Sequence, residues 1–218
     1  NGNWTTADVY DVIGIGRNTI SGVLTSATSG TIGIGYNALT KLISGASNTA
    51  IGYESGKDLT TGSNNAIFGY QALTAVTTGS NNVAVGSNAL DALTIGHSSV
   101  ALGQGTLGSE VVAYGITAIG HGVFSNANRS ASSGSAVLNA QVGIGYIAGS
   151  ATTTGNTNTF IGAYSAVANT TGSRNVTLGY ATLQTATTSN DCVAIGNEAM
   201  AWAQAGQAYS GVVAIGKD

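Results

Sequence analysis

Chemistry-bearing side chains are sparse in this sequence, and none of them is spaced like a catalytic centre. The nine acidic residues stand singly, as Glu54 and Asp91 do, so no pair of carboxylates is placed for glycosidase chemistry. His97 and His121 lie far apart in the chain, without Cys or carboxylate companions at metal-ligand spacing. The sequence therefore predicts no catalytic residue, no metal site and no enzymatic activity.

One glycine-rich segment matches a cofactor-binding pattern in its letters only. The segment from Gly103 to Gly108 reads GQGTLG and has the spacing GxGxxG. A dinucleotide site also needs a following helix and an acidic residue about 20 positions further on. The flanks here are more copies of a short repeated word, so we interpret the match as chance and expect no cofactor.

Tyrosines recur at a regular spacing and are the first candidates for ligand contact. Tyr36, Tyr53 and Tyr70 are evenly spaced, and each directly follows a glycine, as do Tyr146 and Tyr180. Stacked tyrosines could support a sugar ring, or they could cover a coil edge or a seam between subunits.

Threonine pairs form a second regular row. Thr60-Thr61 and Thr77-Thr78 are each followed at once by a glycine. Rows of threonine occur on ice-binding solenoids, but turn chemistry explains a pair that precedes glycine.

The spacing of all these residues comes from one glycine in each repeat. The interval between successive glycines is about 17 residues within two runs. One longer interval, from Gly120 to Gly145, separates the two runs. The repeat glycines are Gly35, Gly52, Gly69, Gly86, Gly103 and Gly120, then Gly145, Gly162, Gly179 and Gly196. A fixed short period predicts a stack of coils in which each coil buries its apolar face only against its neighbours.

A short apolar word precedes each glycine and has the alternation of a β-strand. The residue before the glycine is large and apolar, and the one before that is usually tiny. We expect the large residues, such as Ile161, Leu178 and Ile195, to point into the coil. The tiny residues would then let a neighbouring chain approach closely.

Two further words complete each coil. The glycine opens a segment G-x-x-A-L, which is too short for a stable helix and which we interpret as a second strand. A polar turn of the type TTGSNN then closes the coil. Asparagines such as Asn48, Asn65 and Asn82 share one position and predict a buried amide row.

Composition excludes several classes of protein. Charged residues are 7% of the chain and the net charge is −3, with no basic stripe, so no nucleic-acid partner is expected. No apolar run approaches the roughly 20 residues of a spanning helix, so no membrane insertion is expected. Cys192 stands at a strand position and is expected to be a small buried residue.

The tandem words N-x-A-I-G-x-x-A resemble the head domains of trimeric autotransporter adhesins. The longer unit from Asn48 to Val83 is similar to the repeat shafts of phage tail fibres and spikes. The resemblance covers the chain from about residue 12 to 216 and implies a left-handed β-roll and a homotrimer. It also implies an extracellular location, on a virion tail fibre or a bacterial surface, with other fibre proteins or domains at the ends.

The expected organisation is therefore an all-β parallel β-solenoid of about 12 coils. Residues 1–11 would form an N-terminal cap or shaft junction, and residues 12–218 a single solenoid with an insertion at 121–141. The expected function is a structural or receptor-binding fibre or head module that attaches to a host cell through a surface glycan or protein. The alternatives are a bacterial autotransporter head and an ice-binding solenoid.

The insertion is the least repetitive stretch and the first candidate for receptor contact, because binding residues often lie on loops carried by a rigid scaffold. The residues proposed there are Phe124, Asn126, Asn128 and Arg129. The face formed by the first three tyrosines of the row is the next candidate.

Overall fold

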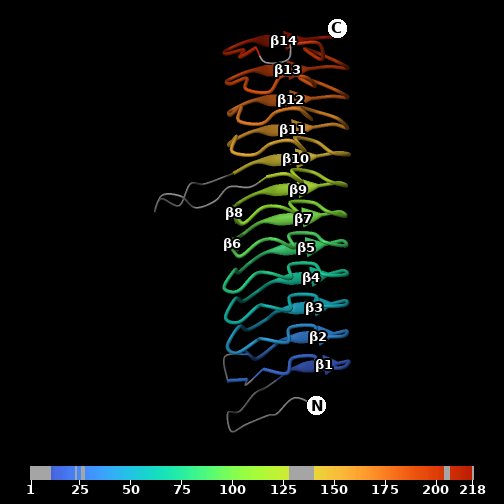
Figure 1. The fold of residues 1–218 in the computed structure, drawn as a ribbon, viewed down its shortest axis with the longest axis vertical. Helices are drawn as coiled ribbons and strands as arrows, with labels where there is room; N and C mark the ends of the chain where they lie inside the picture. Colours follow the sequence, from blue (N-terminus) through green and yellow to red (C-terminus); the bar gives the residue numbers. More distant parts are fainter. Residues whose placement is uncertain (1–10, 23, 26–27, 128–139, 204–206, 218) are drawn as a thin grey trace.

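The described residues form a parallel β-solenoid of about 11 turns with a repeat of about 17 residues. The structure is a computed structural model, and it describes residues 11–22, 24–25, 28–127, 140–203 and 207–217. Figure 1 shows the turns stacked one above another along a single axis. No α-helix occurs in these described ranges. The predicted fold class is confirmed.

Each turn contributes a strand of three residues, and twelve of these strands form one parallel sheet. They are β1 (Ile13–Ile15), β2 (Ile32–Ile34), β3 (Thr49–Ile51), β4 (Ala66–Phe68), β5 (Val83–Val85), β7 (Val100–Leu102), β9 (Thr117–Ile119), β10 (Val142–Ile144), β11 (Thr159–Ile161), β12 (Val176–Leu178), β13 (Val193–Ile195) and β14 (Val213–Ile215). Equivalent repeat positions pair directly, as Leu178 pairs with Ile195. A separate two-stranded parallel sheet joins β6 (Ile95–His97) to β8 (Val112–Tyr114).

The G-x-x-A-L segment is a turn, so the expectation of two strands in every coil was wrong. Asn37 and Leu39 have left-handed backbone, with φ of 55° and 52°. The amide of Asn37 donates to the carbonyl of Arg17 at 3.0 Å, and the amide of Leu39 donates to that of Ser55 at 3.1 Å. These bonds reach the preceding and the following turn respectively. They stabilise a conformation that a bulky residue ordinarily avoids.

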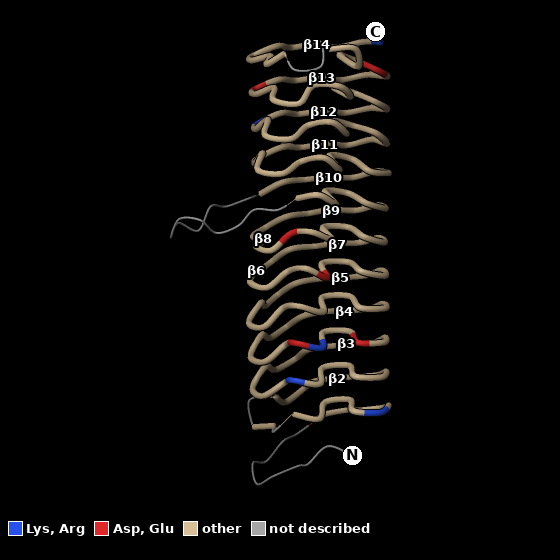
Figure 2. Tube along the Cα trace, viewed as in Figure 1, with Lys and Arg blue, Asp and Glu red and all other residues tan. Residues whose placement is uncertain are grey.

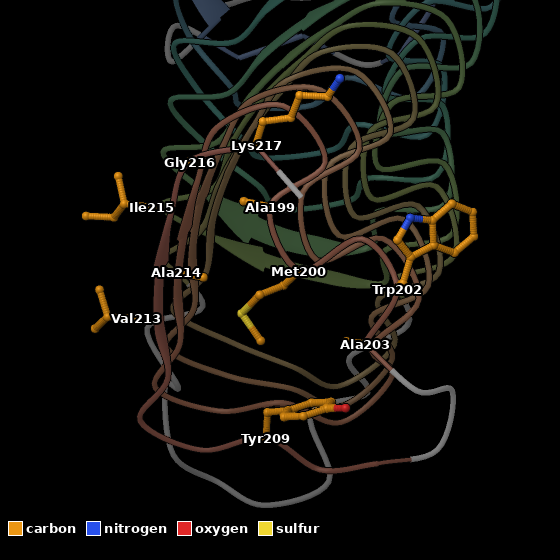
Figure 3. Close-up of a pocket in the computed structure, with 10 residues that line it drawn as sticks. All are labelled: Ala199, Met200, Trp202, Ala203, Tyr209, Val213, Ala214, Ile215, Gly216 and Lys217. Carbon is orange, nitrogen blue, oxygen red and sulfur yellow. The ribbon is translucent and has the colours of Figure 1, made fainter.

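The strands face the opposite way from the prediction. In β13 the middle residue, Ala194, is fully buried, whereas Ile195 is only half-buried. Figure 3 shows the same arrangement in β14, where Val213 and Ile215 point away from the space that the last turn encloses. The large residues therefore lie on the outside of the solenoid, and the tiny ones line its interior.

Packing inside the coil explains why the middle residue is small. The side chain four residues after the repeat glycine is buried and fills the interior, as Leu39 does. At Gly143, a middle position, an added Cβ would lie 2.5 Å from Phe124 of the preceding turn. At Gly149, four residues after its repeat glycine, the small residue stands on the opposite wall. An added Cβ there would lie 2.7 Å from Phe160, which is a large middle residue. The two walls of the coil therefore complement each other in volume.

The repeat glycines are required by both conformation and space. From Gly35 to Gly196 all ten have φ between 129° and 144°. A Cβ on Gly69, for example, would lie 2.4 Å from the carbonyl oxygen of Gly86 in the next turn. No side chain fits between backbones that approach this closely.

The predicted asparagine row is confirmed as a buried hydrogen-bonded ladder. The side-chain amide of Asn65 donates to Asn48 Oδ1 at 3.0 Å and to the carbonyl of Gly79 at 2.9 Å. Cys192 continues the row and is buried as expected, and its backbone amide donates to Asn175 Oδ1 at 3.0 Å. The row fixes the register of successive turns, because each buried amide needs its neighbour.

Candidate functional site

The first and third residues of the twelve strands form one uncharged, mainly apolar surface, which we call the outer face; Thr49, Thr117 and Thr159 are its polar members. Its third residues are all Ile, Leu, Val or Phe, and no charged residue occurs among its positions. Leu178 and Ile15 are 46% and 58% exposed on it. Twelve strands at about 4.8 Å give a surface roughly 50 Å long and 10 Å wide. An apolar patch of roughly 500 Å² is as large as the largest patch on a typical soluble monomer, and such patches often mark a contact surface.

Beside the outer face, the residue after each repeat glycine forms a second surface, which we call the ring row. Tyr36, Tyr53 and Tyr70 stack there with ring centroids 5.2 Å apart and interplanar angles of 17° and 10°. The guanidinium of Arg17 lies over the Tyr36 ring, 5.9 Å from its centroid. The three tyrosines that the sequence singled out are therefore brought together as a partly exposed stack.

A polar row runs beside the tyrosines, one residue further along each turn. The amide of Gln71 donates to one carboxylate oxygen of Glu54 at 2.9 Å, and the amide of Asn37 donates to the other at 3.4 Å. The Lys57 ammonium lies 3.3 Å from the same carboxylate. Hydrogen bonding from Gln71, together with Lys57 and Asn37, lowers the pKa of Glu54. The Glu54 charge in turn raises the pKa of Tyr53, which keeps that phenol protonated.

A second aromatic group lies further along the ring row. His121 stacks on Tyr146 with centroids 5.2 Å apart and an interplanar angle of 16°. Tyr164 packs edge-on against Tyr146 and Tyr180, at 5.5 Å and 5.7 Å. Sequence reasoning missed Tyr164 because it stands two residues after its glycine. The sequence held one sign of this shift. The residue after Gly162 is Ala163, so the ring-row position carries no ring in that turn.

The two aromatic groups are separated by two turns that have no ring at the ring-row position, although they carry His97 and Tyr114 elsewhere. Ser87 and Gln104 occupy the ring row there, between Tyr70 and His121. In the second of these turns Gln104 is followed by Gly105, and an added Cβ on Gly105 would meet nothing within 4 Å. The row of rings is therefore interrupted by small and polar groups.

The receptor residues proposed in the insertion are not brought together by the structure. Phe124 is fully buried, with its ring 6.0 Å from that of Phe160, so its assignment to a receptor surface was wrong. It stands four residues after Gly120, at the position whose side chain fills the interior of most coils. Asn126 is exposed. Asn128 and Arg129 lie outside the described residues.

The boundaries of the insertion also differ from the prediction. Residues 121–127 continue the regular coil, as shown by the amide of Phe124 donating to the carbonyl of Ala148 at 3.2 Å. Gln141 already belongs to the next turn, where its side-chain amide donates to the carbonyl of Gly155 at 2.6 Å. Residues 128–139, between these points, lie outside the described residues.

The remaining polar candidates, Thr60 and His97, form hydrogen bonds between neighbouring turns. The Thr60 hydroxyl donates to the carbonyl of Thr77 at 2.8 Å, so this threonine row joins neighbouring turns. His97 Nδ1 accepts the backbone amide of Ser80 at 3.0 Å. The GQGTLG segment is an ordinary turn of the solenoid with no helix after it among the described residues. Within the described ranges, no three His, Cys, Asp or Glu residues gather as a metal site.

Charges are few, and the described ion pairs are local. Figure 2 shows acidic and basic residues scattered along an otherwise uncharged trace. Lys41 lies 2.9 Å from Asp58, and Arg174 lies 2.6 Å from Asp191, each pair joining adjacent turns. Hydrogen bonding to Arg174 lowers the pKa of Asp191. These pairs contribute little stability because they are largely exposed.

A hollow of about 580 Å³ lies at the last described turn. Figure 3 shows Met200 pointing into it and Tyr209 lying at one side. Its lining is mostly apolar, and Lys217 is the one charged residue among the lining side chains. Among the described residues that line it there is no His, Cys, Asp or Glu.

Comparison with protein-family models, with curated proteins and with solved structures gave no match. The part of the chain that the structure describes has no helix of the length and apolarity needed to cross a membrane.

Proposed function

We propose that this chain is a homotrimeric attachment module of a fibre or surface adhesin, which binds a host-cell surface through a glycan or a surface protein. The single observation that supports it best is the outer face. A stiff rod with one long, uncharged apolar side is suited to pack against copies of itself. The number three comes from the resemblance to trimeric adhesins and fibres.

The area of the outer face supports assembly. Its roughly 500 Å² of flat sheet is more than half of the ~800 Å² that each partner buries in a stable interface, and the relief of Ile, Val and Leu side chains adds to it. Burial of side chains such as Leu178 and Ile215 would add hydrophobic stabilisation to that of the buried interior of each coil. Both sides of the sheet would then be covered, as is usual for parallel sheets.

Trimerisation would also explain attachment without a deep pocket. Three copies of a shallow polar and aromatic surface can bind together, and linked weak contacts give far greater avidity than any one of them. The ring row is such a surface, because Tyr53 and Tyr70 are 43% and 51% exposed. The head of a bacterial autotransporter adhesin remains the alternative, and it shares this mechanism.

Attachment can be tested with the purified 218-residue chain on fluorescent beads. We expect the beads to adhere to at least one cell type in a panel of bacterial and animal cells. Free chain should compete, and a variant that is folded but monomeric should adhere much less. Beads that adhere to no cell in the panel, with folded trimeric chain on them, would remove the proposal.

A further inference from the structure

We infer that the ring row contains a saccharide site at Ser87, where a neutral hexopyranose takes the place of an absent aromatic ring. The inference rests on the proposed function, because it names a ligand class and a position for attachment. The proposed sugar contact lies at the end of the tyrosine stack, and not along the sides of the stacked rings.

The first wall of this site is the free face of Tyr70. Tyr53 and Tyr70 lie nearly parallel, 5.2 Å apart, so one face of Tyr70 is covered. Its other face is turned toward the next turn, where Ser87 carries no ring. By contrast, Tyr36 lies between Arg17 and Tyr53.

The spacing of the turns suits a sugar at that place. Successive turns are about 4.8 Å apart, so a ring-sized body over Ser87 would lie at stacking distance from Tyr70. The C–H groups on one face of a pyranose carry partial positive charge and are attracted to the negative face of an aromatic ring. The other tyrosines of this stack offer mainly ring edges.

The second wall supplies hydrogen-bonding groups. Gln104 is exposed in the next turn, and its side-chain amide makes no hydrogen bond with the described residues. An amide can donate to one sugar hydroxyl and accept from another. The Ser87 hydroxyl donates to Asn88 Oδ1 at 3.0 Å and keeps its own lone pairs for a ligand. Asn88 is held in turn by Asp91, because its amide donates to Asp91 Oδ2 at 3.0 Å.

The backbone leaves this place open. Gly105 and Gly122 follow Gln104 and His121, so no side chain stands beside them in the polar row. The three turn steps from Tyr70 to His121 span about 14 Å, which is ample for one pyranose beside the Gln104 side chain.

Local charge favours a neutral sugar. Asp91 lies in the same turn as Ser87, and Glu54 lies two turns away. The ammonium of Lys57, the cation of the Glu54 turn, is already paired with Glu54 at 3.3 Å. An acidic sugar would meet uncompensated negative charge, whereas a neutral hexopyranose would not.

The test is saturation-transfer NMR on the whole 218-residue chain, with methyl β-glucopyranoside and methyl β-galactopyranoside as probes. We expect millimolar binding of at least one glycoside to the unaltered chain. Ser87→Tyr adds a ring in the missing place and should weaken binding by about tenfold or more while keeping the stack folded. Gln104→Ala should weaken binding as well. Tyr70→Ser removes the stacking face and should weaken binding strongly. Tyr36→Ser is the matched control, because that ring has no free face, and it should bind normally.

Several outcomes would overturn the site. These are no saturation transfer from the unaltered chain with either probe, a Ser87→Tyr variant that binds as well as the unaltered chain, or equal losses in Tyr36→Ser and Tyr70→Ser. Cell attachment is measured separately. Beads that adhere without glycoside binding would reject the saccharide site and keep the attachment function. Glycoside binding without adhesion would keep the site and reject the attachment function.

Discussion

At the scale of single residues, the repeat glycines limit what the turns can tolerate. Gly69 combines a φ of 144° with a backbone contact in which an added Cβ would lie 2.4 Å from the next turn. Gly115 has a φ of 65° but open space around its missing Cβ. Substitutions at Gly69 and Gly115 therefore distinguish the cost of a positive φ from the cost of steric overlap with the next turn.

We expect Gly69→Ala to lower the free energy of unfolding by about 3 kcal/mol or more, since strain and overlap add. Gly115→Ala should cost only about 1 kcal/mol, from backbone strain alone. Urea unfolding at fixed chain concentration measures both. Equal losses in the two variants would show that the turns can separate to admit a methyl group.

Glu54 gives the stack a defined acid response. Its pKa is lowered in the folded chain, first by the hydrogen bond from Gln71. The unfolded chain therefore takes up this proton first as pH falls. The stabilisation is complete at neutral pH and is lost as pH falls below about 4.5 and through the lowered folded pKa.

We expect Glu54→Gln to flatten the fall in stability over that acidic range, as measured by urea midpoints at a series of pH values. Glu198→Gln is the matched control, because Glu198 also stands two residues after its glycine and accepts no Gln or Lys hydrogen bond from the described residues. If both variants follow the unaltered chain in acid, the Glu54 network does not contribute.

At the scale of elements, the strand has two apolar sides of different size. Ala194 faces the interior and is fully buried, while Ile195 belongs to the outer face. Ala194→Asp should therefore bury an unpaired charge at a cost of several kcal/mol and abolish the folded β-structure. Ile195→Asp should leave each chain folded and weaken assembly. Circular dichroism and molecular mass measured on both variants would contradict this orientation if the effects were reversed.

The sequence predicted the stack and its register but not which side of the strand is inside. Both alternating positions are apolar, Ala or Ile, so periodicity separates two faces without identifying them. The side-chain volumes on the two walls of the coil could have identified the inner side. Gly143 and Gly149 stand where Phe124 and Phe160 need space, which places the tiny residues in the interior.

The turns were predicted less well than the strands. Leu39 and its equivalents adopt left-handed backbone that no intrinsic preference of leucine favours. Hydrogen bonds to the neighbouring turns decide this conformation, and such bonds exist only once the turns are stacked. The stacked tyrosines could be predicted because a fixed period places like side chains above one another. Tyr164 breaks that register, and its only sign in the sequence is Ala163, which occupies the ring-row position beside it.

At the scale of the whole molecule, the outer face is the feature that a single chain leaves unexplained. Twelve strands present a long, mainly apolar side without a charged residue, while ion pairs such as Lys41–Asp58 and Arg174–Asp191 lie elsewhere and join neighbouring turns. Association along this side would bury the bulky residues of every turn together. The ring row would then run along the edge of each interface, parallel to the axis of the assembly.

The molecular mass of the folded chain in native buffer shows whether copies of the chain cover the outer face. Light scattering on the unaltered 218-residue chain should give three times the 21.4 kDa of one chain, independent of modest dilution. A folded species with the mass of a single chain would contradict the account, because the outer face would then be stable in water without a partner.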